Sequence, residues 1–251
     1  MPNYRVDIEY DGAAFHGWQI QAGGKVTVQG ALMEAIQRVT GERVVVSGSG
    51  RTDAGVHAEA QVASFRLQVP WEPLRLQRAL NGVLPRAVSV EHLTRVSDTF
   101  DARRSAVGKR YRYRIWNSPQ RSPLRAHRQV HVPKRLDLAS MQAAAAVLVG
   151  EHDFASFQAA GSEVLTTVRR LSRLEVLGDP GGEVEIVAEG SGFLRHMVRN
   201  LAGTLIEVGH GKRSPGSMGT LLAAACRDRA GPTAPAHGLS LERVDYPETL
   251  E

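Results

Sequence analysis

Apolar and polar residues follow the same succession of patterns in the two halves of the chain. In the first half, short apolar or alternating runs predict strands, and apolar residues spaced three and four apart predict helices. The expected elements, in order, are a strand at 5–10, a helix at about 27–39, strands at 44–47 and 61–67, a helix at 74–84 and a strand at 88–96. Gly41 follows the first helix as a natural stop. The order is that of a β-α-β-β-α-β ferredoxin-like unit.

The second half repeats this order more loosely. Its expected elements are a strand at 110–116, a helix at 136–149 ended by Gly150, a hairpin of strands at 171–177 and 184–188, helices at about 193–208 and 215–229, and a closing strand at 239–246. Glycines and Pro180 mark the turn of the hairpin. We therefore expect an α+β fold of two ferredoxin-like α/β halves, residues 1–104 and 105–251, with mixed, mainly antiparallel sheets and a groove where the sheets meet.

Basic residues are concentrated just after the expected boundary. Residues 100–135 contain eleven Lys or Arg and one acid, Asp101, a net charge of +10, whereas the whole chain carries +5, so the remainder is net −5. Most basic residues are arginines, which bind phosphates bidentately and stack on bases, although a GC-rich genome would give the same overall preference. The local concentration predicts a surface for a polyanion such as a nucleic acid.

Composition narrows the class of protein further. With 251 residues, 42% of them hydrophobic and 23% charged, the chain is typical of a globular protein with a substantial core. A single cysteine, Cys226, excludes an internal disulfide and a cysteine-based zinc cluster. No apolar run has membrane length and no leader follows Met1, so we expect a cytoplasmic protein. The histidines are scattered without the spacing of metal ligands, so we expect no metal site.

The strongest local signal for chemistry is the segment Gly48 to Ala58, GSGRTDAGVHA, which lies between two expected strands. Its glycines surround one carboxylate, Asp53, and permit a positive φ and the close approach of a partner. Taken alone, the segment is most simply an Asx turn. It is a poor match to a phosphate-binding P-loop, because it lacks G-K-[ST] and no helix signal follows at once.

The segment Gly50 to Ala58 resembles the active-site loop of the TruA family of tRNA pseudouridine synthases. Other segments resemble motifs of the same family, in order: Tyr10-Asp11-Gly12 with Phe15 and Gly17-Trp18-Gln19, KRYRY at 109–113, GFLRHMVRN at 192–200, and GLSL at 238–241 followed by Val244 and Tyr246. The resemblance thus extends from Tyr10 to Tyr246. Residues 158–167 match no motif, so their role stays open.

The resemblance implies that the protein isomerises uridine to pseudouridine in the anticodon arm of tRNA, at positions 38, 39 and 40, and that it works as a homodimer. The reaction breaks the N1–C1′ bond, turns the uracil and rejoins it through C5, so it requires neither a cofactor nor a metal. It does require a carboxylate, and the resemblance assigns that role to Asp53. Whether Asp53 attacks C1′, attacks C6 or abstracts the C2′ proton stays open.

The resemblance also assigns Tyr111 and Arg199 to the active site. The ring of Tyr111 would stack on the flipped uracil, and its hydroxyl could serve a proton transfer. Arg199 would keep Asp53 ionised in a closed pocket, because desolvation disfavours the charged form. Arg195, four residues earlier, is expected on the same helix face, where a solvated arginine is the simpler interpretation. Taken alone, Tyr111 and Tyr113 are ordinary strand residues, and Tyr113 keeps that interpretation.

Further arginines are expected to bind the substrate, tRNA, in a central cleft where the two sheets meet. Arg51 could pair with Asp53 or fill the gap left by the extruded base. Arg110, Arg112 and Arg114 alternate with tyrosines along one strand, so they face the other side of the sheet and suit phosphates.

Two other classes of function are weaker. A non-catalytic RNA-binding protein of tandem ferredoxin-like units is the main alternative, since basic strands with tyrosines suit it. A pure binder, however, gains nothing from a carboxylate such as Asp53, which repels phosphates. An RNA nuclease or deaminase is disfavoured by the lack of metal and cysteine ligands. His57 and His196 lie within motifs, and we expect them to be structural.

Overall fold

The computed structural model of the chain describes residues 1–161 and 164–247. It consists of two compact units. Unit 1 comprises Met1–Val107 and Ser240–Glu251, and unit 2 comprises Gly108–Leu239. The closing strand thus belongs to unit 1, whereas the sequence pattern placed it in the second half. Its end is held there by Tyr246, whose hydroxyl donates to the carbonyl of Ala102 at 2.7 Å and whose ring lies 5.1 Å from that of Phe100.

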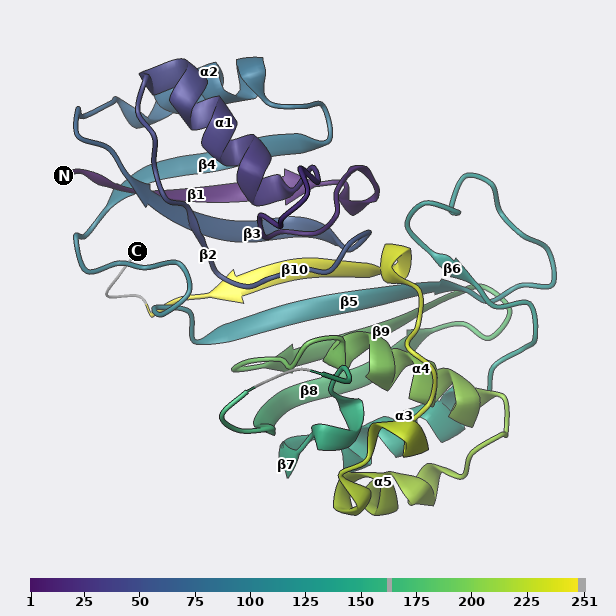
Figure 1. Ribbon diagram of the computed structural model, residues 1–251. Helices are drawn as coiled ribbons and strands as arrows, with labels where there is room; N and C mark the ends of the chain where they lie inside the picture. The colour runs from purple at the N-terminus through teal and green to yellow at the C-terminus, as the bar shows by residue number, and fades with distance from the viewer. Residues whose placement is uncertain (162–163, 248–251) are drawn as a thin grey trace. The chain divides into compact units, whose positions relative to one another are not determined.

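Unit 1 is built on an antiparallel sheet with helices on one face. Its elements are β1 (Asn3–Tyr10), α1 (Val28–Thr40), β2 (Ser47–Gly48), β3 (His57–Arg66), α2 (Pro73–Val83), β4 (Val88–Val96) and β10 (Leu239–Asp245). β1 lies between β4 and β3 and is antiparallel to both. Two strands pair with the other edge of β3, β2 antiparallel at Ser64 and β10 parallel at His57. Figure 1 shows α1 and α2 on the same side of this sheet.

The helices of unit 1 begin and end where local chemistry requires. The hydroxyl of Thr27 accepts from the Gly30 amide at the start of α1, and Gly41 ends that helix with a φ of 78°. The Glu72 carboxylate accepts from two amides of the first turn of α2, just before Pro73. Because Leu32, Ile36 and other apolar residues lie on the inner face, these helices bury the core of the unit.

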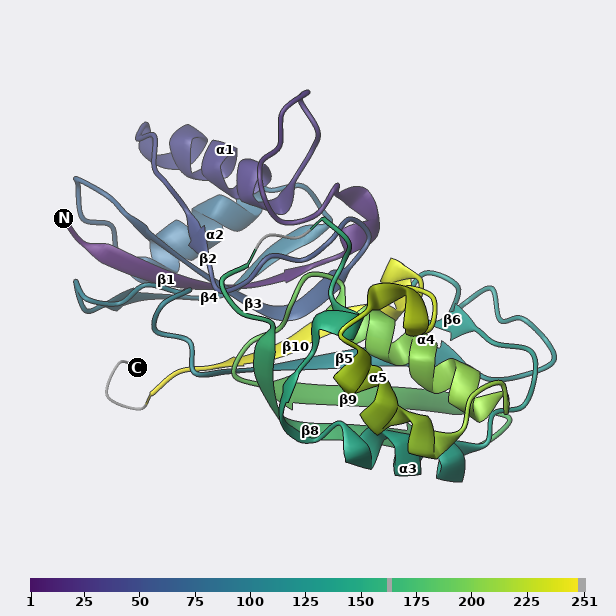
Figure 2. The ribbon, with the colours of Figure 1, turned by 60° about the horizontal axis from the view of Figure 1, so that its bottom comes forward.

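Unit 2 has the same general plan. Its elements are β5 (Gly108–Trp116), β6 (Val130–His131), α3 (Leu138–Val147), β7 (Gly150–Asp153), β8 (Val168–Gly178), β9 (Glu183–Gly190), α4 (Met197–Gly209) and α5 (Met218–Ala224). The strands run in the order β5-β9-β8-β7, each antiparallel to its neighbour, and β6 adds a short parallel pairing to β5. Figure 2 shows the helices of this unit together on one side of its sheet.

The prediction of an α+β fold with mainly antiparallel sheets is confirmed. In unit 1 the order of elements is β-α-β-β-α-β, and the strands lie in the order β4-β1-β3 with β2 at the edge, as in a ferredoxin-like unit. In unit 2, β5, α3, the β8–β9 hairpin and α4 follow in the expected order. The strand at 88–96 has the predicted bounds.

Several predicted elements are wrong in extent; the strand expected at 61–67, for example, begins at His57. The strand at 44–47 pairs only from Ser47 onward, and the Val46 carbonyl accepts from the Gln29 side-chain amide at 2.8 Å instead of from a neighbouring strand. α4 begins at Met197 and not at residue 193, since His196 before it has a φ of 62°. The helix at 215–229 is interrupted, because Ala225 is left-handed with a φ of 45°, and only Met218–Ala224 is α-helical.

Among the residues that the structure describes, no helix combines the length and the apolar character needed to cross a membrane.

Candidate active site

Asp53 lies on a tight turn in unit 1, between β2 and β3. The Val56 amide donates to the Asp53 carbonyl at 3.1 Å, and Gly55 closes the turn with a φ of 79°. That φ is one that glycine adopts without strain, which explains the glycine after Ala54. The Asp53 side chain is half-buried, and Arg51 is exposed. The predicted catalytic carboxylate is thus on a shaped turn and remains accessible.

A buried polar network supports this turn. The Thr52 hydroxyl lies 2.8 Å from the hydroxyl of Tyr10 at the end of β1. Gln61 of β3 donates to the Gly50 carbonyl at 3.0 Å and accepts from the Ser49 hydroxyl at 2.6 Å. The four residues whose side chains form the network, Tyr10, Thr52, Gln61 and Ser49, are at most 6% exposed. Buried hydrogen bonds of this kind fix a loop in one conformation.

The segment from Tyr10 to Gln19, which carries the first family motif along the chain, packs directly against the same turn. The Trp18 amide donates to the Thr52 carbonyl at 3.0 Å. A Cβ on Gly12 would lie 2.0 Å from the Val56 carbonyl oxygen, and one on Gly17 would lie 2.8 Å from the Thr52 oxygen. Glycine is therefore required at both positions so that the two segments can touch. The spacing of this motif is explained by the shape of the turn that it contacts.

Tyr111 and Tyr113 of β5 point into unit 2, as their alternation with arginines predicted. Tyr111 is 7% exposed, and its ring stands edge-on to that of Phe193 with centroids 5.0 Å apart. Tyr113 is fully buried, and its hydroxyl donates to the Pro235 carbonyl at 3.0 Å. Burial raises the pKa of Tyr113, and the positive charge of Arg199 opposes that shift.

Arg199 lies in the first turn of α4 and is bound to the segment that precedes β10. Its Nε donates to the Ala234 carbonyl at 2.8 Å, and its own carbonyl accepts from the Ala234 amide at 3.1 Å. Arg227 holds the same segment, with bonds to the Gly231 carbonyl and the Thr233 hydroxyl at 2.9 and 3.1 Å. Arg195 precedes the helix and is exposed, so the expectation of a shared helix face with Arg199 is wrong.

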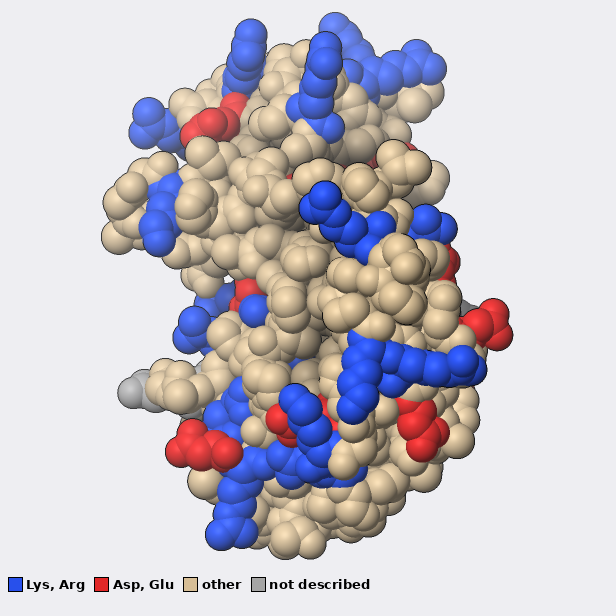
Figure 3. Space-filling model, turned by 90° about the vertical axis from the view of Figure 1, so that its right-hand side faces the viewer, with Lys and Arg blue, Asp and Glu red and all other residues tan. Residues whose placement is uncertain are grey.

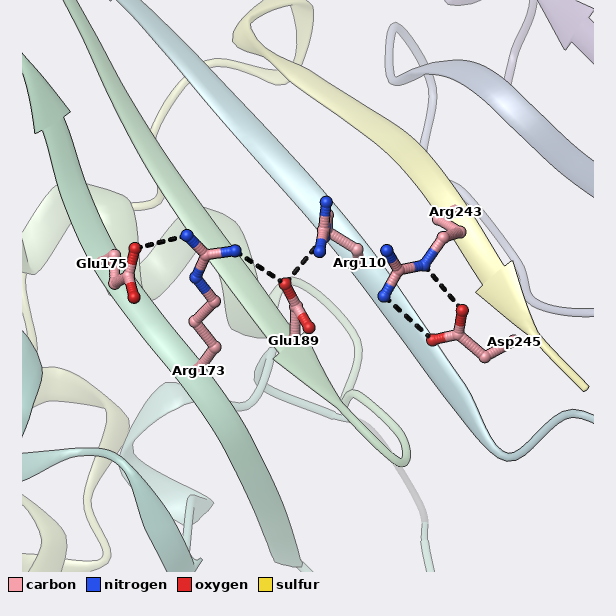
Figure 4. A network of polar contacts seen from close by, with 6 residues as sticks. All are labelled: Arg110, Arg173, Glu175, Glu189, Arg243 and Asp245. Carbon is pink, nitrogen blue, oxygen red and sulfur yellow. Dashed lines mark hydrogen bonds and ion pairs between the residues drawn. The ribbon is translucent and has the colours of Figure 1, made fainter.

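The three arginines of β5 face the opposite side of the sheet and have acidic partners on β9. Arg112 lies 2.5 Å and Arg114 3.6 Å from the carboxylate of Glu185. Arg110 lies 2.7 Å from Glu189, which also binds Arg173 of β8 (Figure 4). These pairs follow from the register of β5 with β9, which sets Arg110 opposite Glu189 and Arg114 opposite Glu185.

Acidic residues therefore offset part of the positive charge counted in the sequence. Figure 3 shows one face of the molecule, where Asp and Glu side chains stand among the many Lys and Arg side chains. The segment 100–135 carries its charge of +10 in the sequence, but Arg110 and Arg112 share theirs with carboxylates 79 and 73 residues away along the chain. Phosphate binding by these arginines would compete with the ion pairs.

The predicted site residues are distributed over both units. Asp53 and Arg51 lie in unit 1, while Tyr111, Arg199 and the arginines of β5 lie in unit 2. Sequence reasoning missed two supporting residues, Tyr10 beside the Asp53 turn and Arg227, which holds the same segment as Arg199. Tyr10 stood within a noted motif, but no local pattern indicated its hydrogen-bond partner. Arg227 had no signal of its own.

The other predictions concern metals, histidines and the loop at 158–167. In the described part of the chain, no three His, Cys, Asp or Glu side chains are grouped as a metal ion requires.

His57 is buried, and its Nδ1 lies 3.1 Å from the Gly12 amide, so it helps to hold the Asp53 turn. In the loop, the Ala159 amide donates to the Arg195 carbonyl, whereas residues 162–163 lie outside the described residues.

Comparisons with known proteins agree with these motifs. A family model for tRNA pseudouridine synthase matches residues 8–103 and 144–247. A tRNA pseudouridine synthase A from Myxococcus xanthus is 46% identical over 98% of this chain and 92% of its own length. A protein of the same name from Azorhizobium caulinodans is 45% identical over 100% of this chain and 96% of its own length. Another, from Ruminiclostridium cellulolyticum, is 44% identical over 98% of this chain and 100% of its own length. By its matched segments, which include Asp53 and Arg199, and by these full-length relatives, the chain belongs to the tRNA pseudouridine synthase family.

Proposed function

We propose that this protein is a tRNA pseudouridine synthase that isomerises uridines 38, 39 and 40 of the anticodon arm, with Asp53 as nucleophile or base. The observation that carries the proposal is the Asp53 turn. It lies inside the first segment matched by the family model, its neighbours are held by buried hydrogen bonds, and Asp53 itself is a half-buried residue. A carboxylate placed in this way can meet a base that has been flipped out of its stack.

The chemistry is balanced without any added reagent. The N1–C1′ bond breaks, the uracil turns, and a C5–C1′ bond forms, after which C5 loses a proton and N1 gains one. Asp53 starts this sequence either by attack on C1′ or C6 or by removal of the C2′ proton. No oxidant or energy-rich group takes part, so we expect full activity without a cofactor or a metal.

Other residues act on the same uridine in this proposal. The ring of Tyr111, already set edge-on against Phe193, provides a stacking surface for the uracil, and its hydroxyl serves the proton transfer at C5. Arg199 contributes a positive charge to the catalytic site. Arg51, which is exposed two residues before Asp53, fills the space of the extruded base.

The partners of the protein follow from the same proposal. Its substrate is tRNA, whose backbone is bound by Arg110, Arg112 and Arg114, and the protein works as a homodimer in the cytoplasm, where tRNA is processed. Arginine suits this contact because its planar group binds phosphate through two hydrogen bonds.

Incubation of the purified protein with unmodified tRNA transcripts, followed by position-resolved detection of pseudouridine, tests the function directly. We expect conversion at positions 38, 39 and 40 in tRNAs that carry uridine there, and none in transcripts with cytidine at these positions. Binding of tRNA without any conversion would overturn the enzymatic proposal in favour of an RNA-binding protein. Conversion at another position only would overturn the choice of substrate site.

A further inference from the structure

The residue directly before Asp53 is held at two atoms from two different segments. The Thr52 carbonyl accepts from the Trp18 amide at 3.0 Å, and its hydroxyl lies 2.8 Å from that of Tyr10. The Asp53 carbonyl in turn accepts from the Val56 amide at 3.1 Å. These hydrogen bonds hold the stretch of backbone from which the Asp53 side chain extends.

Two hydrogen bonds of this network have a defined direction, those that Gln61 makes with Gly50 and Ser49. The Gly50 carbonyl can only accept, so the group of Gln61 that lies 3.0 Å from it is the amide nitrogen. The Gln61 oxygen then faces Ser49, whose hydroxyl donates to it. The same nitrogen lies 3.5 Å from the Tyr10 oxygen, and the Tyr10 and Thr52 hydroxyls share a hydrogen bond of 2.8 Å in which either oxygen can donate. Ser49, Gln61, Tyr10 and Thr52 thus form one connected set of hydrogen bonds.

We propose that Tyr10 is a positioning residue for the catalytic carboxylate, and that it acts through its hydrogen bond with the Thr52 hydroxyl. This inference rests on the proposed role of Asp53. Tyr10 is the last residue of β1, so a rigid strand carries its hydroxyl to the turn. The hydroxyl is also buried, and burial raises the pKa of Tyr10 to about 12.

Another tyrosine of the same strand provides a matched comparison. Tyr4 is also buried, and its hydroxyl donates to the Trp71 carbonyl at 3.0 Å and accepts from the Trp71 amide at 2.8 Å. Both hydroxyls therefore have hydrogen-bond partners inside unit 1. The Tyr10 hydroxyl is bound to the Asp53 turn, whereas the Tyr4 hydroxyl is bound to Trp71. Tyr10→Phe and Tyr4→Phe remove the same atom from the same strand.

The test measures single-turnover rate, steady-state kcat and KM, and thermal stability for both variants. We expect Tyr10→Phe to lower kcat by about ten- to a hundredfold, as a small misplacement of a catalytic group does, with little change in KM. Tyr4→Phe should lower the melting temperature at least as much and leave kcat unchanged. A loss of stability alone cannot produce this difference.

Thr52 variants complete the test. Thr52→Val keeps the shape and removes the hydroxyl, so it should reproduce the kinetic effect of Tyr10→Phe, whereas Thr52→Ser should restore most of kcat. The double variant with Tyr10→Phe should be no slower than either single variant, because both remove the same bond. Equal kcat for wild type, Tyr10→Phe and Thr52→Val, with Asp53→Asn inactive, would overturn this inference and leave the proposed function intact. A wild-type protein that makes no pseudouridine would instead overturn the function.

Discussion

Arg112 of β5 forms an ion pair with Glu185 of β9, with 2.5 Å between Nη1 and Oε2, and Arg114 shares the same carboxylate at 3.6 Å. Both arginines were expected to bind phosphate. Their side chains are 24% and 21% exposed, so they are neither free in solvent nor fully buried. Binding of RNA here would exchange one anionic partner for another.

Replacement of Arg112 and Arg114 by Ala should weaken tRNA binding and flatten the plot of log affinity against log salt. The slope should fall by roughly 0.7 to 0.9 for each phosphate that the variant no longer neutralises. Glu185→Gln should act in the opposite direction, because it removes the carboxylate that competes with phosphate for both arginines. Arg38→Ala, an exposed arginine of α1, serves as control. An unchanged slope in the double Ala variant would show that this face does not contact the RNA backbone.

Asp53→Asn should abolish isomerisation and leave tRNA affinity within a few-fold of wild type. The change is nearly isosteric, and it removes only the negative charge that the chemistry uses. Tritium release from uridine labelled at C5 measures turnover, and filter binding measures affinity. Asp7→Asn, which removes a carboxylate paired with Arg5 at 2.9 Å, is the control and should remain active. Substantial turnover by the Asp53 variant would refute its catalytic role.

Tyr111→Phe and Tyr111→Ala should separate the two roles proposed for this side chain. Phe keeps the ring against Phe193, whereas Ala should lose about 1–3 kcal/mol of base stacking. If the hydroxyl removes the C5 proton, the Phe variant should bind tRNA normally and form product slowly in a single turnover.

Tyr113→Phe is the matched control for Tyr111. It removes one buried hydrogen bond to Pro235, so it should cost about 0.5–1.5 kcal/mol of stability and leave the rate unchanged. Turnover at the wild-type rate by both Phe variants would mean that Tyr111 acts through its ring alone.

Alkaline pH should destabilise the protein partly through Tyr10. Burial raises the pKa of its hydroxyl from 10.0 to about 12, although the hydrogen bond with Thr52 opposes the shift. Between these values the unfolded chain loses the proton and the folded chain keeps it, so the stabilisation is complete below pH 10 and disappears as the pH rises through 12. When the folded and unfolded chains differ by one bound proton, the free energy of unfolding changes by about 1.4 kcal/mol per pH unit.

Urea unfolding between pH 9 and 12 would measure this effect (roughly the range over which tyrosine titrates). The free energy of unfolding should fall less steeply with pH in Tyr10→Phe than in wild type. Tyr113 and Tyr246, whose pKa values burial also raises, keep contributing in both proteins. Parallel curves would show that Tyr10 does not titrate as its burial implies.

Local chemistry sufficed for most of the helices, strands and motifs. Thr27 marks the start of α1 and Gly41 marks its end, because an N-terminal cap and a left-handed residue each act within one turn of the helix. Alternation along β5 correctly predicted that Tyr111 and Tyr113 lie on one face of the sheet and Arg110 on the other, since successive side chains of a strand alternate between faces whatever the strand pairs with. The Asp53 segment was also found from its own residues, although its function came from family resemblance.

Contacts between distant segments were decided only by packing. Tyr10 meets Thr52 across 42 residues, because the turn before β3 packs against the end of β1, and Arg112 meets Glu185 across 73, because the register of β5 with β9 brings them together. A shift of one residue in that register would turn the β5 side chains to the other face, and no local pattern encodes the choice. The charge available to RNA and the support for the Asp53 turn are therefore properties of the folded sheets, while the identity of the carboxylate is a property of the chain.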